Sequence, residues 1–413
     1  MIPVAQIGYK YKLRLNWRTK DRLNQWIGAN RLLWNLALSQ REMIEHKEFK
    51  FRETIAGNFS SLNYNYQEKQ LKALKNEYPF FKDLPSQSLQ QCLMQLDRAV
   101  KSFFKKRADF PKPKKKGKRE AGIRFPSLKE GAIEYDKHSR RKAWVTLPKI
   151  GRLRFVSSRP FSGKVKNVTL TKKGMDFFVS FGVDQDLKVV GNTSGSAVGI
   201  DRGVVHTLAI SNGEFLDLPT ERIKILEDKI AKLQARLAKK KEFSANWMKQ
   251  NEKINRVHNR ITNIRKDFLW KSAHNLTKNH GMIGIEDLGT QRMTQSAKGS
   301  IENPGRNVAQ KSGLNRAILR QGWYDFSVKL KWQAEKHDAR VIEVAPHNTS
   351  IICSACSHKS SANRISQELF RCVECLYEDN ADTNAAKNIL ERAAGATVHN
   401  ALIDLGLDKN PPL

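Results

Sequence analysis

Residues 198–213, Val-Gly-Ile-Asp-Arg-Gly-Val-Val-His-Thr-Leu-Ala-Ile-Ser-Asn-Gly, constrain the fold of this chain more than any other stretch. An apolar run ends in Asp201, a glycine follows, and a second apolar run leads to Asn-Gly. The pattern predicts a β-strand, a tight turn and a returning strand, with one carboxylate where the first strand ends. A single aspartate at a strand end is ordinarily a turn or capping residue, so this stretch alone does not indicate catalysis.

Two distant stretches repeat the arrangement. Residues 280–288, His-Gly-Met-Ile-Gly-Ile-Glu-Asp-Leu, predict a strand that ends in Glu286. Residues 382–390, Asp-Thr-Asn-Ala-Ala-Lys-Asn-Ile-Leu, place Asp382 at the start of a helix. Two divalent ions about 4 Å apart need several anionic oxygen ligands that converge from rigid supports. If the fold brings the three carboxylates together, they suit a two-metal site for phosphodiester hydrolysis.

The three motifs Gly-Ile-Asp-Arg-Gly, Gly-Ile-Glu-Asp-Leu and Asp-Thr-Asn-Ala-Ala-Lys-Asn-Ile resemble the RuvC-type nuclease motifs of the transposon-encoded TnpB family. They are similarly close to the miniature type V CRISPR effectors that descend from this family. The resemblance implies that Asp201, Glu286 and Asp382 bind two catalytic Mg²⁺ ions. Because all three carboxylates are present, the motifs give no sign of an inactive enzyme.

Two of these carboxylates have close rivals in the sequence. Glu378 and Asp379 precede Asp382, and the family places its ligand two residues before the asparagine of Asn-Ala-Ala, which selects Asp382. Asp287 follows Glu286, and the two would point to opposite faces if the strand continued through them. The family match selects Glu286.

Two Cys-x-x-Cys pairs near the C-terminus predict a metal centre. Cys353 and Cys356 form the first pair, Cys372 and Cys375 the second, and fifteen residues separate the pairs. This spacing is typical of a tetrahedral zinc site, and four thiolates leave no open coordination position, so we expect one structural Zn²⁺. His358 is an alternative ligand, but with a complete cysteine set it is better explained as an exposed loop residue. TnpB-like proteins carry a zinc-binding module at this place.

The charge of the chain indicates a polyanionic partner. Its 413 residues include 74 Lys and Arg against 41 Asp and Glu, a net charge of +33. No apolar run approaches the roughly eighteen residues of a membrane-spanning helix, and the N-terminus lacks a signal-peptide core. We therefore expect a soluble cytoplasmic protein that binds nucleic acid rather than a membrane. The remaining cysteine, Cys92, is predicted to be a small buried apolar residue.

A basic segment at residues 105–119 is the first candidate for phosphate contacts. Two prolines and a glycine interrupt its lysines, so we expect an extended, mobile strap rather than part of a core. A solvated linker is the alternative, and the charge of the chain favours phosphate contact. The candidate residues are Lys105, Lys106, Arg107, Lys112, Lys114, Lys115, Lys116, Lys118 and Arg119. Arg364 and Arg371, near the cysteines, are either further phosphate contacts or solvated surface residues.

The N-terminal half predicts a small β-barrel with an inserted helical domain. Residues 9–16 alternate as a strand, helical periodicity begins near residue 19 and again after Pro85, and short strands fill 121–187. Ser86 or Ser88 would cap the second helix. The first helices are either a helix-turn-helix docked in DNA or a small bundle with an ordinary core. The arrangement resembles the wedge and recognition regions of TnpB-like proteins.

The C-terminal half predicts a nuclease domain with two insertions. Apolar residues at steps of three and four over 223–237 and 254–268 predict an antiparallel helical hairpin with a basic outer face. Residues 289–313 lack periodicity and predict a mobile loop beside Glu286. By family resemblance, this loop gates the site. A single long helix should follow, with Ile318, Trp323 and Leu330 on its apolar face, and then a strand at 340–344.

Together these features predict a multidomain α+β protein, with an RNase H-like (RuvC) α/β nuclease domain that carries a zinc ribbon insertion. In the N-terminal half, the predicted parts are a first barrel strand (1–16), a helical recognition domain (17–107) and the rest of the barrel with the strap (108–190). In the C-terminal half, they are the first part of the nuclease domain (195–346, with the hairpin at 220–270), the zinc ribbon (347–380), and the last part of the nuclease domain with the tail (381–413). By resemblance, the protein is an RNA-guided DNA endonuclease whose partners are a guide RNA and double-stranded DNA with a short flanking motif. We expect a monomer. The alternatives are an RNA-guided DNA-binding protein that does not cleave, and a transposase or resolvase that acts without RNA.

Overall fold

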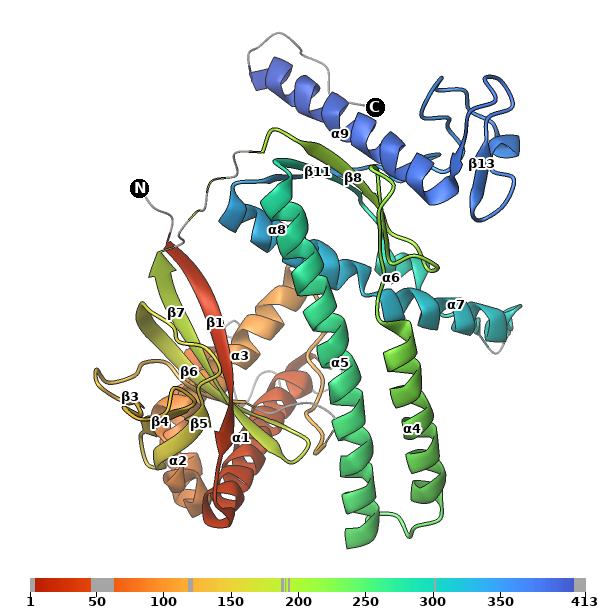
Figure 1. Ribbon diagram of the computed structural model, residues 1–413. Coiled ribbons are helices and arrows are strands. Elements are labelled where there is room, and N and C mark those ends of the chain that lie inside the picture. The colour runs from red at the N-terminus through yellow and green to blue at the C-terminus, as the bar shows by residue number, and fades with distance from the viewer. Residues whose placement is uncertain are drawn as a thin grey trace. The chain divides into compact units, whose positions relative to one another are not determined.

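A computed structural model describes residues 4–45, 63–117, 122–186, 189, 191, 194–300 and 302–404 of the chain. The chain divides into two compact units, residues 1–187 and 188–413 (Figure 1). Each unit has its own hydrophobic core, and each is described separately below.

The first unit is built on a seven-stranded sheet in the order β2-β6-β7-β1-β5-β4-β3. The long strand β1 lies in the middle, antiparallel to β7 through one part of its length and to β5 through the other. In the described residues, β2 and β3 are the two edge strands of this sheet. The closed barrel expected above therefore stays a prediction. The strands are β1 (Val4–Arg14), β2 (Gly122–Phe125), β3 (Ile133–Tyr135), β4 (Lys142–Leu147), β5 (Gly151–Val156), β6 (Lys164–Lys173) and β7 (Asp176–Asp186).

Between β1 and β2 the chain forms α1 (Trp17–Glu45), α2 (Tyr64–Glu77), the 3₁₀ helix η3 (Pro79–Asp83) and α3 (Ser86–Phe104). Alternate residues of the strands and apolar stripes of α1 and α3 bury one continuous core, with Trp26, Leu93 and Phe155 at most 1 % exposed. The expected serine cap of α3 is wrong. Pro85 occupies the N-cap position without a side-chain hydrogen bond, and Ser88 is buried inside the helix. Cys92 is buried as expected, and burial raises its pKa to about 11.

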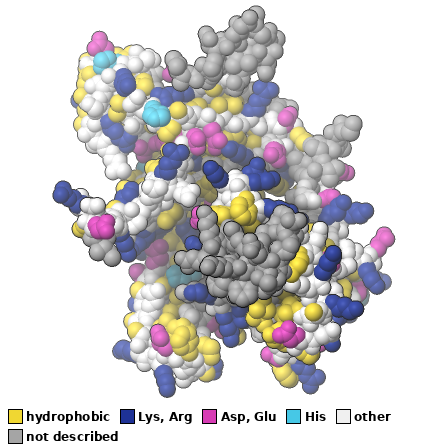
Figure 2. Space-filling view, turned by 180° about the vertical axis from the view of Figure 1, so that it is seen from behind, with side chains coloured by type: hydrophobic (Ala, Val, Ile, Leu, Met, Phe, Trp, Pro, Cys, Tyr) yellow, Lys and Arg dark blue, Asp and Glu magenta, His cyan; other side chains and the backbone are white. Residues whose placement is uncertain are grey.

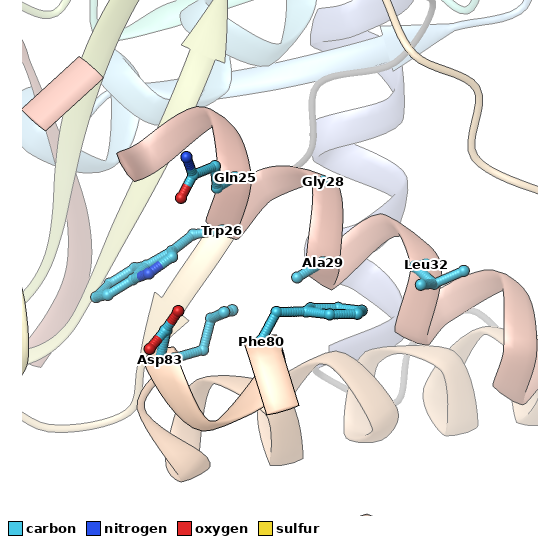
Figure 3. Close-up of a pocket in the computed structure, with 8 residues that line it drawn as sticks. Gln25, Trp26, Gly28, Ala29, Leu32, Phe80 and Asp83 are labelled. Atoms are coloured by element: carbon cyan, nitrogen blue, oxygen red, sulfur yellow. The ribbon is translucent and has the colours of Figure 1, made fainter. Parts of the chain in front are cut away.

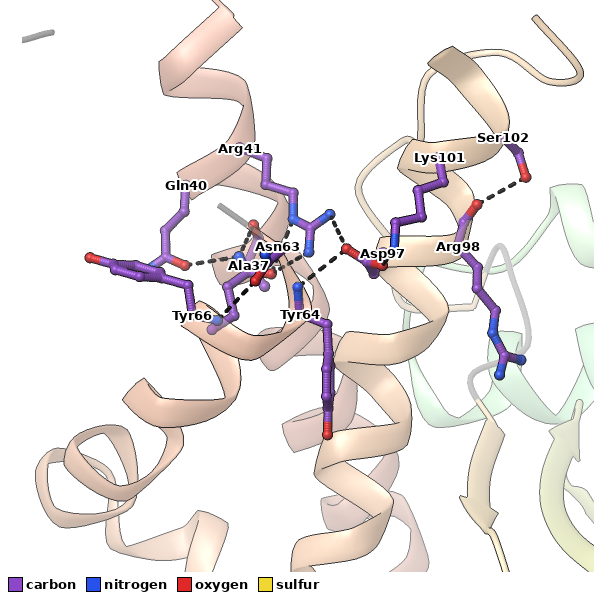
Figure 4. Close-up of polar contacts among 11 residues, drawn as sticks. Ala37, Gln40, Arg41, Asn63, Tyr64, Tyr66, Asp97, Arg98, Lys101 and Ser102 are labelled. Carbon is purple, nitrogen blue, oxygen red and sulfur yellow. Dashed lines mark hydrogen bonds and ion pairs between the residues drawn. The ribbon is translucent and has the colours of Figure 1, made fainter. Parts of the chain in front are cut away.

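Two local features of this unit bear on its stability and surface. Arg41 of α1 and Asp97 of α3 form a buried ion pair at 3.2 Å, and the N–H of Tyr64 also donates to Asp97 (Figure 4). A surface hollow of about 380 Å³ lies between α1 and η3, with Trp26, Leu32 and Phe80 among its lining residues (Figure 3). The hollow is mainly apolar, and Asp83 supplies a carboxylate at its edge.

The second unit is built on a five-stranded mixed sheet in the order β10-β9-β8-β11-β12. Strands β8, β11 and β12 are parallel, whereas β9 and β10 form an antiparallel edge. The predicted strands around Asp201, Glu286 and residues 340–344 are therefore present. Their bounds are β8 (Ala197–Asp201), β9 (Leu208–Ile210), β10 (Phe215–Leu216), β11 (Met282–Glu286) and β12 (Arg340–Val344).

Helices cover both faces of this sheet (Figure 1). Val198, Ile200, Ile283 and Ile285 pack against α5 and α8, which supply residues such as Leu276 and Phe326. Helix α9 covers the opposite face, where Ile389 and Ala393 pack against Val344. The helices are α4 (Thr220–Ala238), α5 (Ala245–Asn279), α6 (Thr290–Met293), α7 (Val308–Gln321), α8 (Trp323–His337) and α9 (Ala381–Asp404).

The predicted antiparallel hairpin is formed by α4 and α5. Ile223, Leu226 and Ile230 of α4 pack against Ile254 and Val257 of α5 in a core of their own. Helix α5 then continues beyond the hairpin, so that its C-terminal half becomes part of the core under the sheet.

The prediction for residues 289–330 was wrong in two places. The region expected to be an aperiodic loop contains the short helix α6 and the first residues of α7. The single long helix expected next is divided into α7 and α8 at Gly322, which has a φ of 75°. A left-handed residue ends a helix, and glycine adopts this conformation without the steric cost of a side chain.

A small two-stranded sheet and a 3₁₀ turn occupy the segment between β12 and α9. They are η4 (Ser361–Asn363), β13 (Leu369–Arg371) and the antiparallel β14 (Glu378–Asn380). Across the described ranges of both units, no helix is both long and apolar enough to cross a membrane.

Candidate active site and metal centre

Asp201 and Glu286 lie side by side at the carboxyl edge of the sheet. Ile200 of β8 pairs in register with Ile285 of the parallel strand β11, so the next residue of each strand is the carboxylate. Neighbouring strands are about 4.8 Å apart, and side chains alternate between the two faces. Asp201 therefore lies on the same face as Gly199, and Glu286 on the same face as Gly284. This is the face that α9 covers.

The glycines let α9 approach this face closely. A Cβ atom at Gly199 would lie 2.0 Å from the carbonyl oxygen of Ala386, and one at Gly284 would lie 2.8 Å from the Cβ of Ala393. The first turn of α9 thereby reaches the carboxyl edge, where a Cβ at Gly203 would lie 3.6 Å from Asp382 Oδ2. The side chain of Asn380 accepts the backbone N–H of Asp382 at 2.9 Å and caps the helix.

The electrostatics of Asp201 reflect the nearness of the other two carboxylates. Burial, followed by the negative charges of Glu286 and Asp382, raises the pKa of Asp201 to about 7. Burial also raises the pKa of Glu286, against the effects of a hydrogen bond from Thr349 and the charge of Arg202. Buried carboxylates that repel one another need cations, and an all-oxygen ligand set suits Mg²⁺. The donor set therefore fits the predicted divalent ions.

The rival carboxylates have other roles in the fold. Asp379 forms an ion pair with Lys387 at 2.8 Å, and Glu378 forms one with Arg371 at 2.6 Å. Asp287 is exposed, whereas Glu286 is only 7 % exposed.

Three further residues contact the carboxylate site, and sequence reasoning did not assign them to it. The hydroxyl of Thr349 donates to Glu286 Oε1 at 2.6 Å, and Arg364 forms an ion pair with Asp382 at 3.2 Å. The buried guanidinium of Arg202 donates to the backbone carbonyl of Glu286 and to Ser327 at 2.6 Å. The arginine directly after Asp201 was the one signal in the sequence that could have indicated such an anchor.

The four cysteines come together as predicted. Their sulfur atoms all lie within 4.8 Å of one another, with 3.7 Å between Cys353 and Cys375 and 3.6 Å between Cys356 and Cys372. A tetrahedral ion with Zn–S bonds of about 2.3 Å separates its sulfurs by about 3.8 Å. The cluster therefore fits Zn²⁺. Within the described parts of the chain, the three carboxylates do not form so tight a group.

The two Cys-x-x-Cys turns have the same backbone design. The N–H of Ser357 donates to the carbonyl of Cys353 at 2.9 Å, and the N–H of Leu376 donates to that of Cys372 at 3.1 Å. Ser357 and Leu376 both have positive φ, at 61° and 59°, which reverses the chain after each pair. His358 is not part of the sulfur cluster, as expected, but it is half-buried rather than exposed.

Amide side chains of α9 hold the cysteine segment against the nuclease sheet. Asn388 donates to the carbonyl oxygens of Thr349 and Ile352, and Asn384 donates to Ile352 and accepts the N–H of Ser354. The cysteine segment, Thr349 and Asp382 are thus parts of one hydrogen-bonded structure.

The expectation that the basic strap takes no part in a core is wrong at residues 110–111, because Phe110 packs against the core of the first unit and Pro111 is buried. The strap begins with a turn, in which the N–H of Lys106 donates to the carbonyl of Phe103 at 2.8 Å, and its later residues are anchored to α1. The ammonium group of Lys114 lies 3.8 Å from the centre of the Trp34 ring, and the backbone of Lys114 exchanges hydrogen bonds with Asn35. Lys114 therefore has a structural partner. Lys105, Lys106, Arg107, Lys112, Lys115 and Lys116 are exposed, whereas Lys118 and Arg119 lie outside the described residues. Figure 2 shows Lys and Arg side chains spread over the face that it presents.

Comparison with known families matches three parts of the chain. The model described as "Probable transposase" matches residues 180–297, which include Asp201 and Glu286. The model described as "Cas12f1-like, TNB domain" matches residues 323–389, which include the four cysteines and Asp382. A model of a helix-turn-helix domain matches residues 1–48.

Individual proteins and structures extend these matches to nearly the whole chain. InsQ of Escherichia coli (strain K12), named as an RNA-guided DNA endonuclease, is 39% identical over 393 residues, which cover 95% of this chain and 92% of InsQ. A Streptomyces pristinaespiralis protein of the same description is 25% identical over 96% of this chain and 92% of its own. The cryo-EM structure of a Cas12f1–sgRNA–target DNA complex has a similar α+β fold, with a TM-score of 0.55 and 14% identity, covering 91% of this chain and 83% of that chain. With the match to InsQ and the nuclease motifs described above, the chain belongs to the TnpB family.

Proposed function

We propose that this protein is a transposon-associated, RNA-guided DNA endonuclease that hydrolyses phosphodiester bonds at Asp201, Glu286 and Asp382. The observation that carries the proposal is the placement of Asp201 and Glu286 at paired strand ends, with Asp382 brought to them by α9. This mixed sheet, with helices on both faces, supports an RNase H-like domain. The names of InsQ and its Streptomyces relative support the activity.

In this proposal the three carboxylates hold two Mg²⁺ ions. Bound Mg²⁺ lowers the pKa of the attacking water and stabilises the charge on the leaving 3′ oxygen. Thr349 holds one oxygen of Glu286 by its hydrogen bond, and Arg202 fixes the backbone of the same residue. Arg364 places a positive charge beside Asp382. These contacts orient the ligands before substrate arrives, which is the protein's part in metal-ion catalysis.

The cysteines would hold one Zn²⁺ in a zinc ribbon with a structural role. The ion would take the place of a hydrophobic core that this short segment cannot build. Because Asn384 and Asn388 tie the segment to α9, the ribbon would also help to position Asp382.

The proposed partners are a guide RNA and double-stranded DNA with a short flanking motif, which a cytoplasmic monomer would bind. The Cas12f1 complex contains an RNA and a target DNA, and the charge of +33 suits two such polyanions. Guide pairing would read the sequence, and the protein would read the flanking motif. The first unit would act as a wedge-like barrel with an inserted helical domain, and the exposed lysines of the strap would contact phosphates.

The test is to purify the protein from its native host, sequence the RNA that accompanies it, and use that complex to cleave matching DNA. One dominant RNA with a constant scaffold and a variable end, together with Mg²⁺-dependent cleavage that Asp201→Ala abolishes, is the expected result. Specific binding without cleavage by the wild type would instead indicate an RNA-guided binding protein. Cleavage that persists after the RNA is removed would indicate a transposase or resolvase.

A further inference from the structure

The tip of the α4–α5 hairpin carries an exposed aromatic residue in an unfavourable backbone conformation. Phe243, in the turn between the helices, is 75% exposed and has a φ of 60°. A bulky residue at positive φ costs roughly 1–3 kcal/mol, and such strain is concentrated at functional sites. Glycine would form the same turn without this cost. The side chain of Phe243 therefore needs an explanation other than the fold.

The ring of Phe243 forms part of a small aromatic surface. Its centre lies 5.5 Å from that of Trp247, with 44° between the ring planes, and Met248, the next residue of α5, is 55% exposed. Ser244 caps α5 by accepting the backbone N–H of Trp247 at 3.2 Å, which anchors the first turn of the helix that carries this residue. The aromatic surface is thus carried by a capped helix end.

Positive charge surrounds these rings. Residues 236–249 contain five basic residues and one acidic residue, Glu242. Lys239, Lys241 and Lys249 are exposed, and among the ion pairs of the described residues none involves them. A hydrogen bond at 2.9 Å from Gln250 to the carbonyl of Leu233 fastens the two helices together just behind the tip.

We propose that the tip, formed by Phe243, Trp247, Lys239, Lys241 and Lys249, binds an unpaired nucleotide of a single-stranded nucleic acid. The base would stack on Phe243, and the lysines would contact the flanking phosphates. Exposed aromatic rings within a basic surface are the usual means of binding single strands without sequence preference. The inference rests on the proposed function only in taking nucleic acid as the partner, and both a guide RNA and a DNA strand have the required chemistry.

The test measures the affinity of the full chain, freed of copurified RNA, for oligouridine RNA, oligothymidine DNA and a DNA duplex. Phe243→Gly relieves the strained backbone and removes the ring, Phe243→Tyr keeps a stacking ring, and Ile225→Ala changes a residue of α4 that is 69% exposed but lies away from the tip. We expect Phe243→Gly to weaken single-strand binding by at least about fivefold. Phe243→Tyr and Ile225→Ala should bind as the wild type does, and no variant should change duplex binding.

Salt dependence separates stacking from the electrostatic attraction of the lysines. Phe243→Gly should leave the slope of log K against log salt unchanged. Combining Lys239→Gln with Lys241→Gln should reduce the slope by about 0.7 for each phosphate that the protein no longer neutralises. Weaker binding of RNA alone would identify the guide as the ligand, and weaker binding of DNA alone would identify a DNA strand. Unchanged affinity for both would overturn the proposal. Binding is measured without cleavage, so this result is independent of the nuclease activity.

Discussion

The guanidinium group of Arg364 lies 3.2 Å from Oδ1 of Asp382, so the cysteine-bearing segment contacts the carboxylate site directly. The same nitrogen of Arg364 donates to the carbonyl of Gln367 at 3.1 Å, which holds the side chain in place. The charge of Arg364 also opposes the rise in the pKa of Asp201. One arginine thus offsets part of the negative charge that three neighbouring carboxylates create.

We expect Arg364→Ala to lower the rate of DNA cleavage about 100-fold, because a positioned charge beside the reacting groups is worth this much in other enzymes. Arg364→Lys should retain part of the activity, and RNA binding should not change. Arg371→Ala is the matched control, because Arg371 pairs with the exposed Glu378. The Arg371→Ala protein should cleave DNA at the rate of the wild type. Equal cleavage rates for the two alanine variants, measured under single-turnover conditions, would contradict a role for Arg364 at the site.

We expect Cys372→Ser to abolish the zinc binding proposed for the four cysteines and to lower the melting temperature of the protein. Cleavage should fall as well, because the cysteine segment is bonded to α9 through Asn384 and Asn388. Metal analysis of the purified variant checks the first effect, and thermal unfolding checks the second. Cys92→Ala is the control, since Cys92 is buried in the other unit and lies outside the sulfur cluster. A Cys372→Ser protein that kept one zinc per chain would show that the four-cysteine assignment is wrong.

The positions of the three motif carboxylates in the fold could be predicted because the sequence signals are local. Each motif carboxylate directly ends a strand or begins a helix, and parallel strands align their carboxyl ends at one edge. The spacing of the cysteines likewise allowed the sulfur cluster to be expected before the fold was known. The hairpin of α4 and α5 was predictable for the same reason, because two neighbouring helices with matching apolar stripes can bury these stripes against each other.

The features that could not be predicted depend on contacts between distant residues. Thr349 donates to Glu286 and its own carbonyl accepts from Asn388, and no pattern in the sequence connects these three residues. The break at Gly322 was missed because apolar periodicity continues across it. A Cβ atom at Gly322 would lie 3.3 Å from Leu269, so the packing also favours glycine here. This contact exists only in the folded protein and cannot be predicted from the sequence.

We expect Gly199→Ala to lower the free energy of unfolding by about 1–3 kcal/mol, the usual cost of overpacking a core. The new methyl group would lie 2.0 Å from the carbonyl of Ala386, so α9 would have to move away from the sheet. Because α9 carries Asp382, cleavage should fall together with stability. Gly195→Ala is the matched control, since a Cβ there meets no atom within 4 Å. Denaturant unfolding of both variants is the measurement, and equal stability would show that α9 does not pack on Gly199 as described.

The buried ion pair between Arg41 and Asp97 predicts a pH dependence of stability. Burial alone would raise the pKa of Asp97, but hydrogen bonds and charges from Lys101 and Arg41 outweigh it and hold the pKa below its usual range. A carboxylate with a lowered pKa in the folded state stabilises the fold above its unfolded pKa of about 3.9. This contribution is lost as the pH falls through the folded pKa.

Accordingly, Asp97→Asn should lower the free energy of unfolding by about 3 kcal/mol at pH 7, because it leaves the buried Arg41 without a counterion. The difference from the wild type should shrink as the pH falls below about 4. Asp176→Asn is the control: Asp176 pairs with Lys12 at 2.7 Å on the surface, where an ion pair contributes about 1 kcal/mol or less. Urea unfolding of the full chain at a series of pH values gives the comparison. If the difference in free energy of unfolding between Asp97→Asn and the wild type stayed constant below pH 4, the charge of Asp97 would not stabilise the helical part of the first unit.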